Sequence, residues 1–331
     1  MPCAQARILQ IHPTRFCNLS CLHCYSSSGP TIRDGLPVGL IEGALADAAA
    51  EGYTIAGFSG GEPTLYPQLP EAVRAARAHG FTVTVTTNGT RLTAPLLDAL
   101  TGNVDLVAVS IDGRPASHDH IRGSSTAFKR MDQRIPALRE SGIPFGFIFT
   151  LTQHNLDELP WVAEYALEQG AGLLQVHPLE GAGRALECLH DAHPDGTELS
   201  YAFILAARLR AVVGDAMRLE IDLSERRALE SLPPPPAAPE AAPLSALANP
   251  LVIESDGTVV PGQHGMARVH ALGNLQHESI AAMGRRWARE GFGRYHAVRA
   301  RAAAELLRED AGTPFINWQE QVAMRAQAAT P

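Results

Sequence analysis

The sequence is poor in cysteine, in aromatic residues and in long apolar runs. Only 5 of its 331 residues are cysteine, and 6% are aromatic. Three of the cysteines lie within eight residues, which fits metal binding in a reducing compartment better than a disulfide framework. No apolar run approaches the ~18–20 residues of a membrane span, and the N-terminal residues lack a signal-peptide core. The sequence therefore predicts a cytoplasmic protein without membrane spans.

Basic residues are also scarce. The chain has 27 Lys and Arg against 35 Asp and Glu, a net charge of −8. Nonspecific nucleic-acid binding needs a basic surface, so nucleic acid is not an expected partner. The 45% hydrophobic content is ordinary for a globular protein. On a prior of roughly 100–200 residues per domain, the length predicts about two domains.

Apolar segments alternate with helical segments through the first two thirds of the chain. The predicted strands are residues 7–12, 53–58, 81–86, 104–111, 143–150 and 172–177, and helices are expected over about 37–51, 67–79, 157–169 and 197–217. Such alternation predicts a parallel sheet with right-handed crossovers, and nearly continuous apolar strands predict a sheet covered on both faces. The expected fold class is α/β: a partial (β/α)6 TIM barrel with a small α+β C-terminal cap.

Composition divides the chain into three segments. Residues 232–250 are rich in Pro and Ala and are expected to form an extended, semi-stiff linker without helix or sheet. Residues 1–231 would form the barrel and residues 251–331 the cap, which opens on a hairpin around Asp256-Gly257. Most of the unusual residue clusters directly follow a predicted strand, where barrels and open α/β sheets place their active sites.

Three cysteines form a C-x3-C-x2-C run: Cys17, Cys21 and Cys24. Three thiolates are one short of the four that close a structural zinc site or an ordinary iron–sulfur cluster. If they hold a four-iron cluster, one iron stays open to a ligand that is not protein. An open coordination position is a mark of a catalytic metal.

A Gly-Gly-Glu turn lies one β/α unit later, in Ser59-Gly60-Gly61-Glu62. Together with the cysteine run, it resembles the radical S-adenosylmethionine (SAM) superfamily over residues 7 to about 185. The resemblance implies that the three cysteines bind three irons of one [4Fe–4S] cluster and that SAM chelates the fourth.

The resemblance also implies a set of SAM contacts. The turn from Ser59 to Glu62 would lie against the methionine amino group, where glycines permit a close backbone approach. The other implied SAM contacts are Thr87, Asn88, Ser110, Asp112 and Arg122. Within this set Asp112 would suit the ribose hydroxyls and Arg122 the carboxylate. The residues alone leave plainer alternatives: a strand-to-helix turn, a helix N-cap at Asp112 and a solvated charge at Arg122.

Three weaker candidates lie on the substrate side. His177 and Glu180 follow the sixth predicted strand, and Cys188 is a further thiol of the barrel half. His177 and Glu180 could face the substrate at the barrel mouth, and Cys188 could be the hydrogen donor that an epimerisation needs. The alternatives are a structural histidine, a surface ion pair and a small buried apolar residue.

The segments 256–262 and 272–275 resemble the opening of the SPASM or twitch extension of the same superfamily. In that extension a cysteine stands at the place of Gly262 and helps to bind an auxiliary cluster. This sequence has no cysteine after Cys188. The resemblance therefore implies a degenerate, metal-free cap that closes the open side of the barrel and shapes the pocket.

The predicted function is a biosynthetic radical SAM enzyme, an oxidoreductase that uses a 5′-deoxyadenosyl radical to abstract hydrogen from its substrate. The substrate is either a ribosomal peptide, modified by crosslinking or epimerisation, or a small metabolite such as a sugar, nucleoside, amino acid or tetrapyrrole. Expected partners are a one-electron donor such as flavodoxin or ferredoxin and, for a peptide, a separate leader-peptide-binding protein. Two non-enzyme alternatives are an iron–sulfur carrier and a zinc module completed by His12 or His23.

Overall fold

One ten-stranded sheet organises the molecule in the computed structural model, which describes residues 6–308 and 313–328. The strand order is β11-β10-β9-β1-β2-β3-β4-β5-β6-β7, and within the described residues no ladder joins the two edges. The parallel strands of the barrel are β1 (Ile8–Ile11), β2 (Ile55–Phe58), β3 (Thr82–Thr87), β4 (Leu106–Ile111), β5 (Phe145–Leu151), β6 (Leu173–Pro178) and β7 (Arg218–Ile221). The predicted α/β partial barrel is confirmed, with one parallel strand, β7, beyond the predicted six.

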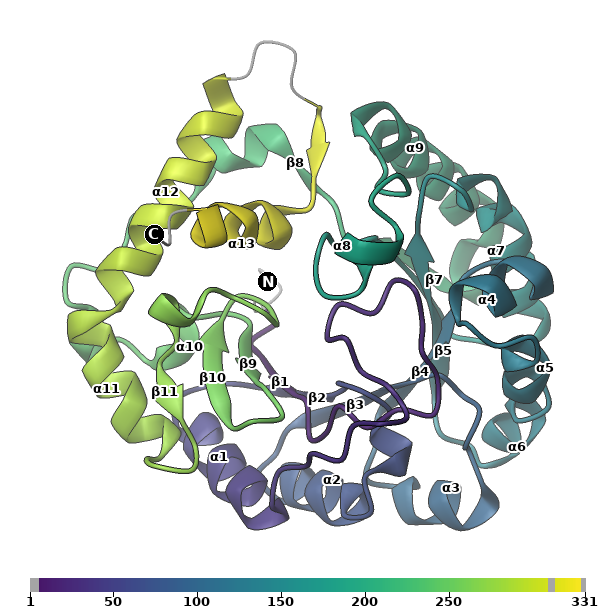
Figure 1. The fold of residues 1–331 in the computed structure, drawn as a ribbon, viewed down its shortest axis with the longest axis horizontal. Coiled ribbons are helices and arrows are strands. Elements are labelled where there is room, and N and C mark those ends of the chain that lie inside the picture. Colours follow the sequence, from purple (N-terminus) through teal and green to yellow (C-terminus); the bar gives the residue numbers. More distant parts are fainter. Residues whose placement is uncertain (1–5, 309–312, 329–331) are drawn as a thin grey trace.

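The connecting helices lie on the outer side of the curved sheet (Figure 1). They are α1 (Val38–Ala50), α2 (Leu69–Ala78), α3 (Ala94–Leu100), α4 (Pro115–Ile121), α5 (Ala127–Asp132), α6 (Ile135–Glu140), α7 (Leu159–Glu168) and α9 (Gly196–Val213). The short helix α8 (Ala185–Cys188) instead lies on the inner side, near the long loop that follows β1 (Figure 1). No described helix is both long enough and apolar enough to cross a membrane.

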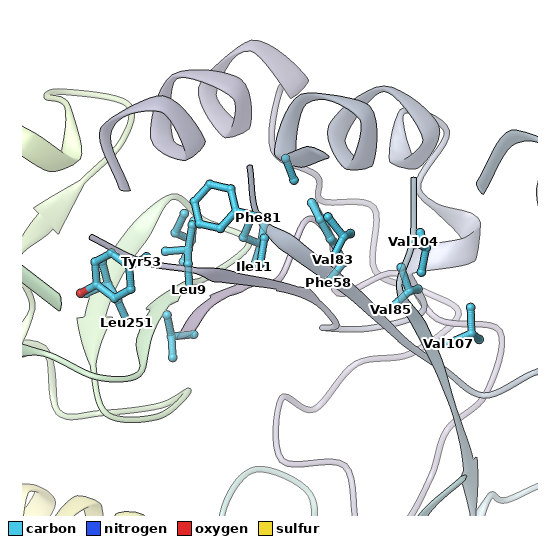
Figure 2. Packing of buried hydrophobic residues seen from close by; sticks show 14 of the residues in the cluster. Leu9, Ile11, Tyr53, Phe58, Phe81, Val83, Val85, Val104, Val107 and Leu251 are labelled. Carbon is cyan, nitrogen blue, oxygen red and sulfur yellow. The ribbon is translucent and has the colours of Figure 1, made fainter. Parts of the chain in front are cut away.

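The main core fills the layer between the strands and the outer helices. Figure 2 shows side chains of this layer, among them Leu9 and Ile11 of β1 and Val83 and Val85 of β3, all of which are buried. Successive side chains of a strand point to opposite faces, so their neighbours face the barrel interior. Several of these neighbours are polar and partly exposed: Gln10, Thr84, Ser110, Thr150 and Gln175. Others are apolar, such as Ala108 and Ile148, so the inner face is mixed, whereas the sequence predicts nearly continuous apolar strands.

The Pro/Ala-rich segment differs from the expected linker. Residues 232–238 are exposed and lack helix or strand, but a 3-10 turn follows at Pro239–Ala241 and then α10 (Leu244–Leu247). Leu244 and Leu247 are buried, and the backbone N of Leu244 donates to Glu51 Oε2 at 2.8 Å. A Cβ at Gly284 would lie 3.1 Å from the Leu244 side chain, so the second half of the segment is anchored both to the C-terminal part and, through the hydrogen bond to Glu51, to the barrel.

The C-terminal part continues the barrel sheet. Strand β9 (Leu251–Ile253) pairs in parallel with β1, and β10 (Thr258–Pro261) and β11 (Gly273–Asn274) follow antiparallel, which confirms the predicted hairpin. The expected helix from about 277 to 308 is two helices, α11 (Ile280–Glu290) and α12 (Phe292–Arg308), separated at Gly291. Further along, β12 (Phe315–Ile316) pairs with β8 (Ser224–Glu225), and α13 (Trp318–Ala328) completes the described chain. The three-segment division of the chain stays a prediction.

Candidate active site

The cysteines lie in the loop between β1 and α1, on the inner side of the sheet (Figure 1). The turn after β2 holds one side of this loop, because the backbone N of Gly61 donates to the Thr14 carbonyl at 2.8 Å. Arg184, next to α8, holds the other side by donating from Nη1 to the Cys21 carbonyl at 2.7 Å. The loop is therefore fixed from two elements that are distant in sequence.

Burial sets the acidity of the cysteine thiols. Cys17 and Cys21 are buried and Cys24 is half-buried. Burial, with the nearby Glu62 as a second cause, raises the pKa of Cys17 to about 12, and burial also raises the pKa of Cys21. Without a bound cation these two thiols stay protonated at neutral pH. A metal at the sulfurs supplies the positive charge that makes thiolates stable.

Each cysteine sulfur also lies within reach of a hydrogen-bond donor. The donors are Asn88 Nδ2 for Cys17 (3.8 Å), Arg122 Nη1 for Cys21 (3.7 Å) and the backbone N of Ser28 for Cys24 (3.2 Å). Donors of this kind stabilise the negative charge of metal-bound sulfur and tune the potential of an iron–sulfur cluster. Three thiols that share a buried loop and carry three such donors fit the predicted cluster.

The two histidines of the zinc alternative are engaged elsewhere. His23 Nε2 lies 3.3 Å from Asp112 Oδ1, and the His12 ring stacks on His264. In the described part of the chain, no three His, Cys, Asp or Glu side chains lie close enough to share a single metal ion. A four-iron cluster does not need that convergence, because each thiolate binds a different iron.

The Gly60-Gly61 turn is packed against the cysteine loop. Gly60 has φ +106°, and a Cβ at Gly61 would collide with the backbone of Arg15 and Phe16. Positive φ and this close approach both favour glycine. Contact between the turn and the cysteine loop therefore explains why glycine stands at these two positions, and the predicted contact of the turn with SAM stays a prediction.

Glu62 joins the turns after β2 and β3. It is fully buried, and its carboxylate accepts four hydrogen bonds: from the backbone N and Oγ1 of Thr64 (3.0 and 2.6 Å), from Thr87 Oγ1 (2.7 Å) and from the backbone N of Asn88 (2.8 Å). The side-chain amide of Asn88 in turn donates from Nδ2 toward Cys17 Sγ. Glu62 thus positions the neighbours of the cluster loop, and its predicted contact with SAM stays a prediction.

Asp112 and Arg122 form a buried ion pair after β4. Arg122 Nε donates to Asp112 Oδ2 at 2.5 Å, and both side chains are almost fully buried. Burial alone would raise the pKa of Asp112, but Arg122 and then His23 outweigh it and hold that pKa far below its usual range. The alternative of a solvated Arg122 is wrong, and the N-cap of α4 is Arg114 rather than Asp112.

This ion pair explains how Arg122 reaches the cysteine loop. Asp112 fixes the guanidinium through Nε, and Nη1 then lies beside Cys21. Ser110, two residues before Asp112, is half-buried at the carboxyl end of β4. The predicted roles of Asp112 at the ribose and of Arg122 at the carboxylate stay predictions.

Two of the substrate-side candidates, His177 and Glu180, lie together at the end of β6, beside Asp222 at the end of β7. His177 Nδ1 lies 2.8 Å from Asp222 Oδ2, and His177 Nε2 lies 3.2 Å from Glu180 Oε1. Gln175 Nε2 donates to the same Asp222 oxygen at 2.7 Å. Cys188 is exposed at the end of α8, so the alternative of a buried apolar residue is wrong for it.

Sequence reasoning missed Asp222. It follows β7, whose sequence Arg-Leu-Glu-Ile is short and charged and gives no strand signal. One signal for Asp222 was available in the sequence. The residue lies between the long helix α9 and the proline-rich segment, at the place where a seventh β/α unit would end. Sequence reasoning also gives no role to His264, which stacks on His12.

We expect Asp222→Asn to flatten the pH dependence of stability. Burial alone would lower the pKa of His177, but hydrogen bonds to Asp222 and Glu180 hold that pKa well above its usual value. The proton on His177 therefore stabilises the fold fully below about pH 6.5, and this contribution is lost as pH rises through the raised pKa. Urea unfolding at several pH values from 6 to 9 should show a smaller loss of stability in the variant than in the wild type. Asp191→Asn, at an exposed carboxylate, is the control. Equal slopes for Asp222→Asn and the wild type would contradict this account.

Comparison with known proteins agrees with this geometry. A family model described as "Radical SAM superfamily" matches residues 11–166, the stretch that holds the cysteine loop, the Gly-Gly-Glu turn and the Asp112–Arg122 pair. The chain carries a radical SAM domain. The expected cofactors, SAM and a [4Fe–4S] cluster, are thereby confirmed at the level of the superfamily.

Relatives of this radical SAM domain include enzymes named for tetrapyrroles and for peptides. The AdoMet-dependent heme synthase of Methanosarcina barkeri is 35% identical over 55% of this chain and 53% of its own length. The PqqA peptide cyclase of Xanthomonas campestris is 29% identical over 62% of this chain and 56% of its own length. The chain thus spans about half the length of these curated relatives.

The fold also matches a solved radical SAM structure beyond the domain itself. The crystal structure of Streptococcus suis SuiB bound to S-adenosylmethionine superimposes with a TM-score of 0.71 at 15% identity, over 89% of this chain and 68% of that one. At this identity the likeness concerns the fold alone. It extends over most of the chain, beyond the 156 residues of the family match at 11–166.

Proposed function

We propose that this protein is a radical SAM enzyme that abstracts a hydrogen atom from a peptide substrate at a single [4Fe–4S] cluster. The observation that carries the proposal is the loop of three thiols, each beside a hydrogen-bond donor, inside the radical SAM domain. Cys17, Cys21 and Cys24 would hold the cluster. When bound, the cluster and SAM supply a 5′-deoxyadenosyl radical, which takes hydrogen from the substrate.

The chain's own side chains position and shield this site. Glu62 holds Asn88 at Cys17, and Asp112 holds Arg122 at Cys21. These groups are buried, so water is excluded from the cysteine side of the site. After β6, a proton is held on His177 between Asp222 and Glu180.

Anaerobic purification tests the proposed activity against its alternatives. We expect a brown protein that carries about four irons and four sulfides and, once reduced, cleaves SAM to 5′-deoxyadenosine and methionine. A brown protein that cleaves no SAM would be an iron–sulfur carrier. A colourless zinc protein would be a regulatory module.

The charges near the barrel mouth favour a peptide. Glu180 and Asp222 share one cation, His177, which leaves an excess negative charge. Nearby basic groups are already engaged: Arg184 binds two backbone carbonyls, and Arg268 binds two carboxylates. A ligand with several carboxylates requires unpaired basic side chains, whereas the main chain of a peptide is neutral.

A tetrapyrrole substrate is the second candidate, because two of the relatives are a heme synthase and an Fe-coproporphyrin III synthase. Titration of the protein with coproporphyrin III, followed by the visible absorbance of the porphyrin, distinguishes a tetrapyrrole substrate from a peptide. We expect no saturable change in this absorbance. In cells that produce the protein, mass spectrometry for a crosslink, or chiral amino-acid analysis for an epimerisation, should find a peptide that changes only with wild-type protein and not with Cys17→Ala. A flavodoxin or ferredoxin donor, a leader-peptide-binding partner and a cytoplasmic location remain predictions.

A further inference from the structure

Two stacked imidazoles join the cap to the barrel. His12 directly follows β1, and His264 lies in the loop after β10. Their ring centroids are 4.8 Å apart, with an angle of 20° between the ring planes. Tyr25, the residue after Cys24, sets its ring edge-on to His264 at 5.3 Å and tilted to His12 at 5.7 Å. One aromatic cluster therefore combines a barrel strand, the cysteine loop and the cap.

This cluster lies directly against the turn after β2. A Cβ at Gly60 would lie 3.1 Å from both Cα and Cβ of His12, so the turn and His12 are in close contact. The Tyr25 hydroxyl lies 3.3 Å from Ser59 Oγ and 3.4 Å from His12 Nε2. Both ring neighbours of His264 thus contact the Ser59-Gly60 turn.

Contacts within the cap hold the loop that carries His264 in place. Glu254 is buried and accepts a hydrogen bond from the backbone N of Gly265 at 2.8 Å. Arg268 pairs with the same carboxylate at 2.6 Å. The backbone next to His264 is thereby fixed, and the ring is presented to His12 from a rigid support.

Stacking, rather than hydrogen bonding, is the main contact of the His264 ring. Its Nδ1 has no hydrogen-bond partner, and its Nε2 lies 4.0 Å from Glu254 Oε1, beyond hydrogen-bond range. Burial lowers the pKa of both His12 and His264, so neither ring carries the charge that would oppose stacking at pH 7. An aromatic ring at position 264 supplies this contact whether or not it has nitrogen atoms.

We propose that His264 is a positioning residue for SAM binding: its ring holds His12 and Tyr25, and through them the Ser59-Gly60 turn. The metal-free cap would then contribute to the cofactor site through aromatic packing. This inference rests on the proposed function, since it requires that the turn contacts SAM.

The test measures SAM binding to anaerobically reconstituted protein by equilibrium dialysis with radiolabelled SAM. His264→Ala removes two aromatic contacts, and we expect about tenfold weaker binding. His264→Phe keeps a ring and should stay within about twofold of the wild type. His277→Ala, at an exposed histidine of the cap, is the matched control and should bind as the wild type does. Iron and sulfide content should not differ among the four proteins.

The outcomes separate this role from a merely structural one. Binding by His264→Ala equal to that of the wild type overturns the proposal. Binding by His264→Phe as weak as that by His264→Ala also overturns it, because the ring would then not be the cause. If the alanine variant does not fold, His264→Leu fills most of the volume without an aromatic face and carries the same expectation. A wild-type protein that holds the cluster but binds no SAM overturns the proposed function itself.

Discussion

Replacing Cys17, Cys21 or Cys24 by alanine should abolish both the cluster and SAM cleavage. Each sulfur would bind its own iron, so losing one of three exposes a second iron and leaves the cluster with too few ligands. The neighbouring donors cannot compensate, since the Asn88 and Arg122 groups that point at the sulfurs carry only N–H groups. We expect iron and sulfide to fall to background, and no 5′-deoxyadenosine by chromatography after reduction.

The matched control for this result is Cys3→Ala, at a cysteine that lies outside the described residues. It should keep iron, sulfide and cleavage at the wild-type level. Loss of activity in the Cys3 variant, or full iron content in any of the three loop variants, would mean that the ligand set is misassigned.

Asp112→Asn should cost the largest amount of stability of any substitution in the site. The change leaves the Arg122 guanidinium buried without its anion, which in proteins typically costs about 3–5 kcal/mol. The free energy of unfolding from urea denaturation measures this loss. Asp98→Asn, on the exposed side of α3, should change it by less than about 0.5 kcal/mol.

The double variant Asp112→Asn, Arg122→Gln separates stability from cofactor binding. Removing both charges eliminates the unpaired cation, so its fold should be more stable than that of the single variant. It should nevertheless bind SAM poorly, because both predicted SAM contacts are changed, that of Asp112 with the ribose and that of Arg122 with the carboxylate. A double variant less stable than Asp112→Asn would show that the pair does not act through charge compensation.

The cysteine loop was predictable because three like residues at fixed spacing identify a site without tertiary information. The strands were predictable from their apolar residues, although only the outward-facing half of each strand is packed against helices. Strand β7 was missed because Arg218 and Glu220 break the apolar pattern in a four-residue segment. Prolines similarly hid α10, where Leu244 and Leu247 are the buried apolar residues.

The protein partners of the two predicted SAM-binding carboxylates were not predictable. Glu62 and Asp112 follow strands, as cofactor-binding residues do, yet the structure surrounds both carboxylates with protein donors. The contact between Asp222 and His177 is known only from the structure, in which β7 pairs with β6 and places the two residues side by side. Such pairings depend on which strands are neighbours, and a single sequence does not contain that information.

The parallel ladder between β1 and β9 has a consequence for any attempt to shorten or exchange the C-terminal part. Leu9, Gln10 and Ile11 pair on one side with β2 and on the other with residues 251–253. A chain cut before residue 251 would turn β1 into an edge strand with unpaired backbone groups, a template for aggregation. Chimaeras with the C-terminal parts of relatives should therefore avoid this aggregation only if the incoming segment restores the register.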